Sequence, residues 1–271
     1  MSPIIENINK MEEIHYLLGN NCNLDCDFCF WDTRMPDVSL EFKKIIIDEI
    51  VKTGIRKVTI SGGEPLCSNN FLETIKYMYE KKLEIILHTN GLKLNKKLAE
   101  QIAPMISRIS LTLDASNNDM MKKMRKNEEL LNHTLFLIEL FNNLNVKVNI
   151  KTLVTKVNKE DIINIGKILQ SLPIQYWSLL EFNPIGRGKK NKNKFYISCE
   201  EFDKVVLKIK NKFSDIPIRA RRYSLANSQY CFISPNGEVY TYHPDKGNVL
   251  MGNLKENSLS STIFKIENAN L

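Results

Sequence analysis

The sequence lacks any apolar run long enough to cross a membrane, and its first twenty residues lack an uninterrupted apolar stretch. Charged side chains at Glu6, Lys10, Glu12 and Glu13 interrupt that segment, which excludes a secretory signal peptide. The absence of both features predicts a cytoplasmic protein without membrane contact. In a reducing cytosol, the six cysteines point to metal binding or catalysis rather than to disulfides.

Acidic residues are scarce in one part of the chain. Residues 184–222 hold twelve Lys or Arg and four acids, so this segment accounts for the net charge of +7 and the rest is about neutral. A localised basic segment attracts phosphates or nucleic acid. It is equally typical of a solvated loop and helix face. We do not expect nucleic acid to be the partner.

Short β-type runs alternate with longer helical patterns, which indicates βαβ units and a parallel sheet. The expected strands are 13–19, 57–61, 83–91, 106–114, 146–154 and 174–182, and the expected helices are 39–54, 71–82, 95–105, 117–143 and 159–172. Right-handed crossovers between six such units predict an α/β fold, a partial (β/α)6 barrel, with ligands at the carboxyl ends of the strands.

The pattern changes after residue 183. A basic stretch at 184–194 reads as a flexible linker, followed by a helix near 199–213. Residues 230–242 read as two strands around a Pro-Asn-Gly turn, and 252–266 as a turn and a closing helix. We therefore predict two parts: a core at 1–183, and at 184–271 a basic linker with a small α+β lid.

Three of the six cysteines, Cys22, Cys26 and Cys29, directly follow the first expected strand. Four thiolates normally close a zinc or iron–sulfur site. Three on one loop can hold three irons of a cubane and leave the fourth iron open. A zinc site with a distant histidine, or cysteines that are merely buried, are the alternatives on spacing alone.

A second motif, Ser-Gly-Gly-Glu-Pro at 61–65, ends the second expected strand. Gly62 and Gly63 allow a close approach of the backbone to a ligand, Glu64 adds a carboxylate, and Pro65 fixes the turn. Alone, this motif is more typical of a turn than of a site. Here it stands one strand–helix unit after the cysteines.

Together, the two motifs resemble the radical S-adenosylmethionine (SAM) superfamily, over roughly residues 13–183. Its Cys-x3-Cys-x2-Cys signature has an aromatic residue before the last cysteine, here Phe28, and its Gly-Gly-Glu motif corresponds to residues 62–64. The resemblance implies a [4Fe–4S] cluster whose open iron chelates SAM. It further implies reductive cleavage of SAM to a 5′-deoxyadenosyl radical that abstracts hydrogen from a substrate.

The same resemblance suggests further SAM contacts. Gly62, Gly63 and Glu64 would hold the methionine ammonium, and Asn90 and Thr112 match positions that contact the ribose or methionyl part. Arg125 would pair with the SAM carboxylate.

Each of these three polar residues also has an ordinary structural interpretation. Asn90 with the following glycine is typical of a turn, Thr112 of a strand, and Arg125 of a charged helix surface.

Asn149 and Lys151 lie two apart on the fifth expected strand and so share a face. Polar residues that face a barrel interior favour a functional role, and we predict that both take part in catalysis. His15 and His88 are interpreted as core histidines.

The closing segment resembles extensions that hold an auxiliary cluster, but it has a tyrosine where a cysteine would stand, so we expect a lid without a second cluster. The basic stretch favours a small phosphorylated, nucleotide-like substrate, contacted by Lys151, Arg187 and Arg34. Arg34 comes from a partial resemblance to viperin-type nucleotide dehydratases, which carry Lys-Ile-Asn where this chain has Asn149-Ile150-Lys151. The alternative is a peptide- or protein-modifying enzyme. Either would need a low-potential electron donor of flavodoxin or ferredoxin type.

Overall fold

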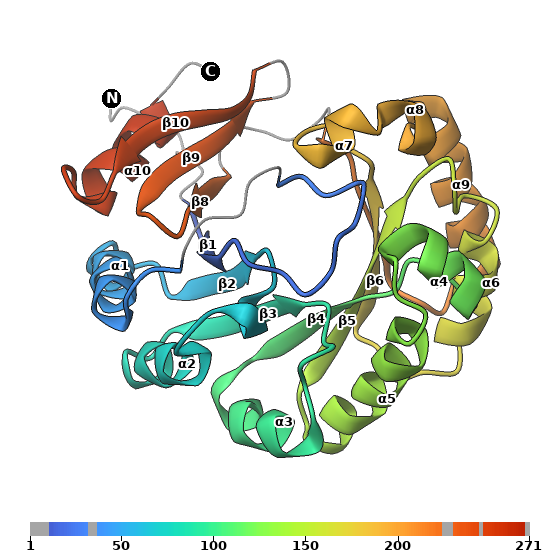
Figure 1. Ribbon diagram of the computed structural model, residues 1–271, viewed down its shortest axis with the longest axis horizontal. Coiled ribbons are helices and arrows are strands. Elements are labelled where there is room, and N and C mark those ends of the chain that lie inside the picture. Colours follow the sequence, from blue (N-terminus) through green and yellow to red (C-terminus); the bar gives the residue numbers. More distant parts are fainter. Residues whose placement is uncertain (1–10, 32–36, 224–229, 244–245, 269–271) are drawn as a thin grey trace, which may run out of the picture.

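A computed structural model describes residues 11–31, 37–223, 230–243 and 246–268. Six parallel strands follow each other in both sequence and space, which confirms the α/β prediction. They are β1 (Glu13–Gly19), β2 (Lys57–Gly62), β3 (Glu84–Thr89), β4 (Arg108–Thr112), β5 (Lys147–Val154) and β6 (Tyr176–Glu181). The sheet curves into an incomplete ring (Figure 1), and we call its concave inner side the lumen.

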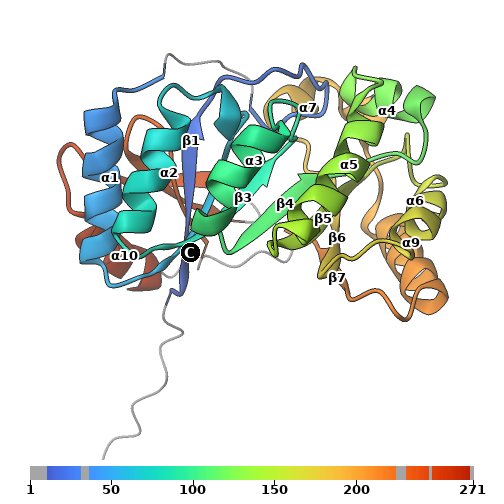
Figure 2. The same ribbon diagram turned by 90° about the horizontal axis from the view of Figure 1, so that it is seen from below.

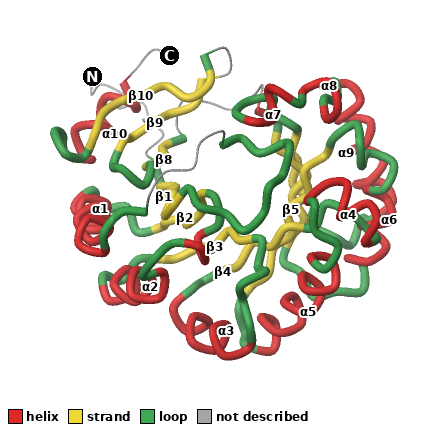
Figure 3. Tube along the Cα trace, viewed as in Figure 1, coloured by secondary structure: helices red, strands yellow, loops and turns green. Residues whose placement is uncertain are grey.

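Six α-helices cover the outer face of this ring (Figures 1 and 3). They are α1 (Leu40–Lys52), α2 (Phe71–Glu80), α3 (Lys96–Ile102), α4 (Asn118–Arg125), α5 (Leu130–Asn143) and α6 (Ile162–Leu169). Two short 3-10 helices, η1 (Pro65–Cys67) and η2 (Ala103–Met105), complete the crossovers. The Ser39 side chain accepts from the amide of Phe42 and caps α1, as expected.

The expected single helix over 117–143 is two helices. Lys126 adopts a left-handed conformation with φ of 57°, and its amide closes α4 on the carbonyl of Lys122. Such a residue ends a helix because the next turn can no longer continue the ladder. The break turns the chain at the carboxyl end of α4, beside the cysteine loop.

Side chains along each strand alternate between an apolar outer face, which packs against the helices, and the lumen face. One row of paired residues runs across five strands and is buried against the helices: Tyr16, Ile60, Leu87, Ile109 and Val148. Their neighbours along each strand point into the lumen, because successive side chains alternate between faces. The apolar half of the pattern therefore builds the core and leaves the other half for a site.

The segment after residue 183 extends the same sheet at both edges. In order, it forms α7 (Arg187–Lys190), α8 (Lys192–Phe195), α9 (Cys199–Lys212), β7 (Ile218–Arg221), β8 (Cys231–Ile233), β9 (Glu238–His243), β10 (Gly247–Asn253) and α10 (Leu259–Asn268). β7 pairs with β6, β8 pairs with β1, and β9 and β10 follow as antiparallel strands.

The expected hairpin at 230–242 is present, whereas β7 and β10 were not anticipated from the sequence. The expected linker at 184–194 is largely the two short helices α7 and α8. A boundary at residue 183 remains a prediction, because one sheet runs across it. No helix in the described ranges has the length and apolarity of a membrane span.

A buried lysine ties α1 to the turn after β2. Lys43 Nζ lies 3.1 Å from Asp37 Oδ2 and 2.8 Å from Ser68 Oγ, and it donates to the carbonyl of Asn69 at 2.5 Å. Both charged side chains of this pair are almost fully buried. Three acceptors compensate the cost of burying the ammonium. The network fixes the segment that follows the Gly-Gly-Glu-Pro motif.

We expect Lys43→Met to lower the free energy of unfolding by about 3 kcal/mol, because it leaves the Asp37 carboxylate buried without its cation. Denaturant titration measures this. Lys44→Met is the matched control, since Lys44 only contacts the Tyr77 ring from outside, at 5.4 Å, and its loss should cost less than about 1 kcal/mol. Equal losses for the two variants would contradict the structural role given to Lys43.

Candidate functional site

The three cysteines lie on the loop after β1, at the edge of the molecule that also holds α4 and α7 (Figure 2). Cys26 is buried and Cys22 and Cys29 are half-buried. A turn joins the last two, with the Cys29 amide donating to the Cys26 carbonyl at 3.3 Å. Burial raises the pKa of Cys22 to about 11 and also raises that of Cys26. Metal binding must therefore displace protons from these thiols.

The Gly-Gly-Glu motif clamps the base of this loop. The amide of Gly63 donates to the Gly19 carbonyl and that of Glu64 to the Asn21 carbonyl, both at 2.8 Å. A Cβ added at Gly63 would lie 2.5 Å from the Asn21 carbonyl oxygen, and Gly62 has a φ of 133°. The glycines approach the backbone that leads into Cys22. Their expected contact with SAM remains a prediction.

Glu64 is buried and already bonded within the protein. Its carboxylate accepts from the Thr89 hydroxyl at 2.5 Å and from the backbone amides of Asn90 and Leu66, at 2.7 and 3.2 Å. Desolvation raises the pKa of Glu64 to about 6, against the three hydrogen bonds that lower it. Pro65 begins the 3-10 helix that follows. Glu64 thereby fixes the end of β3, and its contact with the SAM ammonium remains a prediction.

Asn90, at the end of β3, reaches the cysteine loop. Its Nδ2 donates to Asn23 Oδ1 at 2.9 Å and lies 4.0 Å from the sulfur of Cys22. The turn interpretation also holds, since Asn90 Oδ1 accepts from the Leu92 amide. Thr112 ends β4 opposite Lys151, on the lumen face. Contacts of both residues with SAM remain predictions.

Arg125 is not a surface charge. Its Nε lies 2.5 Å from Asp114 Oδ2, and its NH1 lies 3.7 Å from the sulfur of Cys26. Phe28 packs with its ring centroid 4.7 Å from the guanidinium carbon and meets Phe195 edge to face. The guanidinium is thus fixed beside the cysteine loop. Pairing with the SAM carboxylate is untested.

Arg187 also lies against the cysteine loop. It forms an ion pair with Asp25, and its Nε donates to the Trp31 carbonyl at 3.3 Å. Lys194 pairs with Asp27 nearby, at 3.0 Å. Part of the basic segment therefore binds the loop's own aspartates, and a role for Arg187 toward substrate remains a prediction. Arg34 lies outside the described residues.

Polar side chains line the lumen on neighbouring strands. Lys151 Nζ lies 2.9 Å from His88 Nδ1, and the His15 ring lies 6.4 Å from that of His88. Burial and the charge of Arg221 lower the pKa of Lys151 to about 7. Desolvation also lowers the pKa of His88, so His88 is neutral and accepts from the amine. Asn149 is fully buried, and both polar atoms of its amide lack a partner.

Sequence reasoning placed Asn149 and Lys151 on one face correctly but missed other lumen residues. His15 and His88 face the lumen rather than the outer core. Arg108, Ser110 and Arg221 also belong to this face, through their register with β3, β5 and β6. The two-residue spacing of Arg108 from Ser110 on β4, and of Arg219 from Arg221 on β7, was the available signal.

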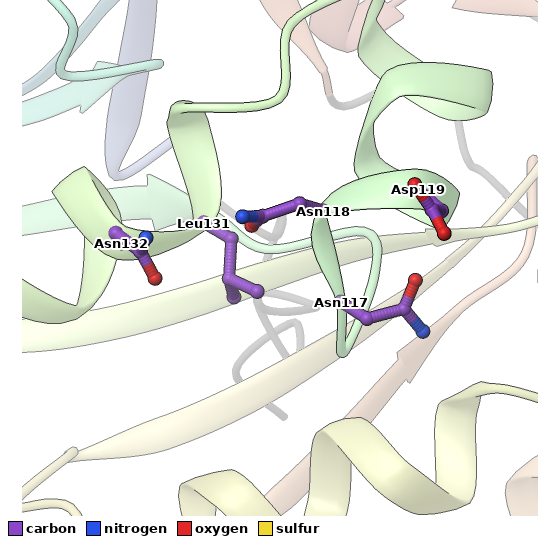
Figure 4. A pocket seen from close by; sticks show the side chains of 5 residues that line it. All are labelled: Asn117, Asn118, Asp119, Leu131 and Asn132. Carbon is purple, nitrogen blue, oxygen red and sulfur yellow. The ribbon is translucent and has the colours of Figure 1, made fainter.

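Outside the lumen, a surface hollow lies where α4 begins, against the start of α5 (Figure 4). It is lined by Asn117, Asn118, Asp119, Leu131 and Asn132. None of the predicted site residues reaches it. Among the described residues, no three His, Cys, Asp or Glu side chains converge on one metal ion. In a cubane each cysteine binds a different iron, so its ligands need not converge.

Residues 16–169, more than half of the chain, match the model of the radical SAM superfamily, and the chain belongs to this family. It is therefore an enzyme of the class that uses a [4Fe–4S] cluster and SAM, which confirms both predicted cofactors. The cysteine loop fits the cluster, since its three thiols lie on one loop beside hydrogen-bond donors.

Two relatives illustrate the range of the family. A GTP 3′,8-cyclase of Clostridium perfringens (strain SM101 / Type A) is 32% identical over 216 residues, covering 75% of this chain and 65% of that protein. The chain thus spans slightly less than two thirds of that relative. The AdoMet-dependent heme synthase of Methanosarcina barkeri is 25% identical over 285 residues, covering 92% of this chain and 80% of that protein.

Solved structures share the fold at lower identity. Streptococcus suis SuiB bound to the precursor peptide SuiA superposes with a TM-score of 0.74 at 17% identity, over 96% of this chain and 65% of SuiB. A structure of anSMEcpe with bound AdoMet gives 0.72 at 16% identity, over 93% of this chain and 80% of that one. These likenesses confirm the partial-barrel fold.

We expect Gly63→Ala to lower the free energy of unfolding by about 3 kcal/mol, because the added methyl group collides with the backbone at Asn21. It should also reduce the iron retained after anaerobic reconstitution. Gly54→Ala is the control: no atom lies within 4 Å of the added carbon, and only its φ of 80° is strained, at about 1 kcal/mol. A Gly63→Ala protein as stable as Gly54→Ala would refute the clamp.

Proposed function

We propose that this enzyme cleaves SAM reductively and abstracts a hydrogen atom from a small phosphorylated, nucleotide-like substrate in the lumen. The observation that carries the substrate class is the charge of the inner face. Arg108, Lys151, Arg219 and Arg221 are among the cations on the lumen side of the sheet, as their strand register shows. A concave wall of this sign concentrates anions and binds phosphate oxygens.

The carboxylate of Glu13, on the same side of the sheet, is already paired within the protein. Glu13, at the start of β1, accepts from the Thr59 hydroxyl and lies 3.4 Å from both Lys57 Nζ and His15 Nε2. It therefore adds little repulsion toward an anion held by Lys151 and Arg221. Desolvation lowers the pKa of His15 to about 3, so this histidine is neutral and adds neither attraction nor repulsion toward an anion.

Aromatic rings form the opposite side of the lumen. The Tyr230 ring lies 4.3 Å from the His15 ring, and Phe232 stacks on Tyr240 at 5.1 Å with 10° between the rings. β8 pairs with β1 such that Phe232 and His15 share one face. A flat base can lie against such rings while its phosphates meet the cations. One aromatic and one cationic wall together suit a nucleotide better than a neutral metabolite.

The SAM-binding roles stay with the residues predicted from the motifs. Cys22, Cys26 and Cys29 would hold the cluster, and the Gly62–Pro65 strand end, with Phe28, Asn90, Thr112 and Arg125, would surround SAM. When bound, the cluster and SAM supply the radical chemistry. This chain's residues orient the substrate, and the Lys151–His88 pair can accept or return a proton at the Lys151 amine. Asn149 offers the substrate an unpaired amide.

The names of the relatives support a nucleotide substrate only in part. The GTP 3′,8-cyclases act on a nucleotide by name, but the chain spans 65% of that relative's length. The peptide-bound SuiB structure shares the fold alone, so a peptide substrate is the alternative outcome of the test below. We further propose a cytoplasmic location and a low-potential flavodoxin- or ferredoxin-type electron donor.

We expect the protein, reconstituted without oxygen, to bind about four irons and, with dithionite and SAM, to release 5′-deoxyadenosine. Cys26→Ala should abolish this release, because one iron loses its ligand. Cys231→Ala, which removes a buried cysteine on β8, should retain it. Zinc without iron in the anaerobic protein, or full SAM cleavage by Cys26→Ala, would exclude the proposal.

The substrate class is tested with deuterated nucleotides, sugar phosphates and peptides, by deuterium transfer into 5′-deoxyadenosine. We expect transfer from a phosphorylated compound, and Lys151→Gln should weaken its apparent affinity at least about tenfold, since a charged hydrogen bond is lost. Lys147→Gln removes an exposed cation from the same face of β5, but at its first residue, and should change the apparent affinity less than about threefold.

Affinity should also depend on pH. The pKa of Lys151 is lowered to about 7, so its amine is charged below pH 7 and neutral above. Binding of the phosphorylated compound should therefore weaken as pH rises from about 7 to 8, and Lys151→Gln should lose this dependence. Transfer from a peptide and from no phosphorylated compound would favour the alternative.

A further inference from the structure

Two guanidiniums lie on either side of the cysteine loop, each beside a different thiol. Arg125, the last residue of α4, places NH1 3.7 Å from the sulfur of Cys26. Arg187 is the first residue of α7; burial lowers the pKa of its guanidinium, but the neighbouring Cys29 thiol outweighs this and raises the pKa. α4 and α7 are far apart in sequence but meet at this loop (Figure 1). Two of the three proposed cluster ligands therefore have a cation of their own.

Each guanidinium is held in place by a carboxylate and by packing. Arg125 pairs with Asp114, whose side chain is fully buried, and lies over the Phe28 ring. Arg187 pairs with Asp25, whose side chain is 63% exposed. The amide of Gly188 donates to the Cys29 carbonyl at 3.0 Å and fixes α7 against the loop. These contacts leave the guanidiniums little freedom to turn away from the sulfurs.

The two hydrogen-bond donors beside the third thiol are neutral. Cys22 accepts from the Leu24 amide at 3.4 Å, and Asn90 Nδ2 lies 4.0 Å away. The positive charge is thus concentrated on the Cys26 and Cys29 side. There, burial disfavours negative charge on the sulfur of Cys26, and the guanidinium of Arg125, 3.7 Å away, opposes that effect. A cation beside a buried sulfur stabilises negative charge on it.

The potential of an iron–sulfur cluster depends on its net charge, on hydrogen bonds to its sulfurs and on its exposure. We propose that Arg125 and Arg187 are positioning residues that raise the reduction potential of the cluster held by Cys22, Cys26 and Cys29. This inference rests on the proposed function. In the step concerned, one electron passes from the donor to the cluster, and no proton or bond moves at either guanidinium.

Arg187 gives the sharper test, because Arg125 belongs to a buried pair whose loss would disturb the loop. In the reconstituted full-length protein, we expect Arg187→Gln to make the potential more negative by about 59 mV or more, a tenfold change for one electron. Lys194→Gln removes the same charge from a neighbouring helix, α8, where its Nζ contacts Asp27 of the cysteine loop at 3.0 Å rather than a sulfur. In Lys194→Gln, the redox equilibrium of the cluster should shift less than about threefold. A redox titration followed by electron paramagnetic resonance measures both.

The two aspartates keep a common partner in these variants, since Lys126 contacts both Asp25 and Asp27. Asp25→Asn removes an anion near Cys29 and should shift the potential in the opposite direction. Arg187→Lys keeps the charge without the fork of donors, and its potential should lie between parent and Arg187→Gln. If Arg187→Gln fails to retain iron, the potentials of Asp25→Asn and Arg187→Lys test the inference instead.

Equal shifts in Arg187→Gln and Lys194→Gln, or no shift in the first, would overturn the inference while leaving the proposed function intact. So would a negative shift in Asp25→Asn. Failure of the proposed function is recognised separately, because it is read from the release of 5′-deoxyadenosine and from deuterium transfer by the unmodified protein, not from the potential.

Discussion

The hydrogen bonds from Gly63 and Glu64 to the carbonyls of Gly19 and Asn21 are the contact on which the site depends. They join the end of β2 to the start of the cysteine loop at a distance that only glycine permits. Glu64 then links this joint to β3 through the Asn90 amide. Three adjacent strand ends are thus aligned before any ligand binds, which is the preorganisation a reactive cofactor site needs.

The lumen is organised by the opposite principle, because its polar groups are incompletely satisfied by the protein. The amide of Asn149 and the hydroxyl of Ser110 lie in register on neighbouring strands, and both are buried without a hydrogen-bond partner. Such groups cost free energy in the folded protein unless a ligand or water pairs with them. The rigid strand ends and the unsatisfied lumen are complementary: the former are proposed to hold the cofactors, and the latter offers hydrogen bonds to a ligand.

Much of this arrangement could be predicted from the sequence. Two local motifs and the alternation of strands and helices sufficed for the partial barrel, the cysteine loop and the shared face of Asn149 and Lys151. The edges of the sheet were missed, because β7 reads Ile-Arg-Ala-Arg, an alternation of only four residues, at the lower limit of length at which alternation indicates a strand. The environment of Arg125 and Arg187 was also beyond the sequence, since ion pairs with Asp114 and Asp25 form between segments that only the fold brings together.

The charged strand β7 has a consequence for association between molecules. It is an outer strand of the sheet, and the end of such a sheet offers unpaired backbone groups to any other extended chain. Arg219 and Arg221 are exposed there. A second strand could add to this edge only by bringing its own backbone over two guanidiniums and displacing their water. The residues proposed to favour an anionic ligand would therefore also hinder aggregation at this edge.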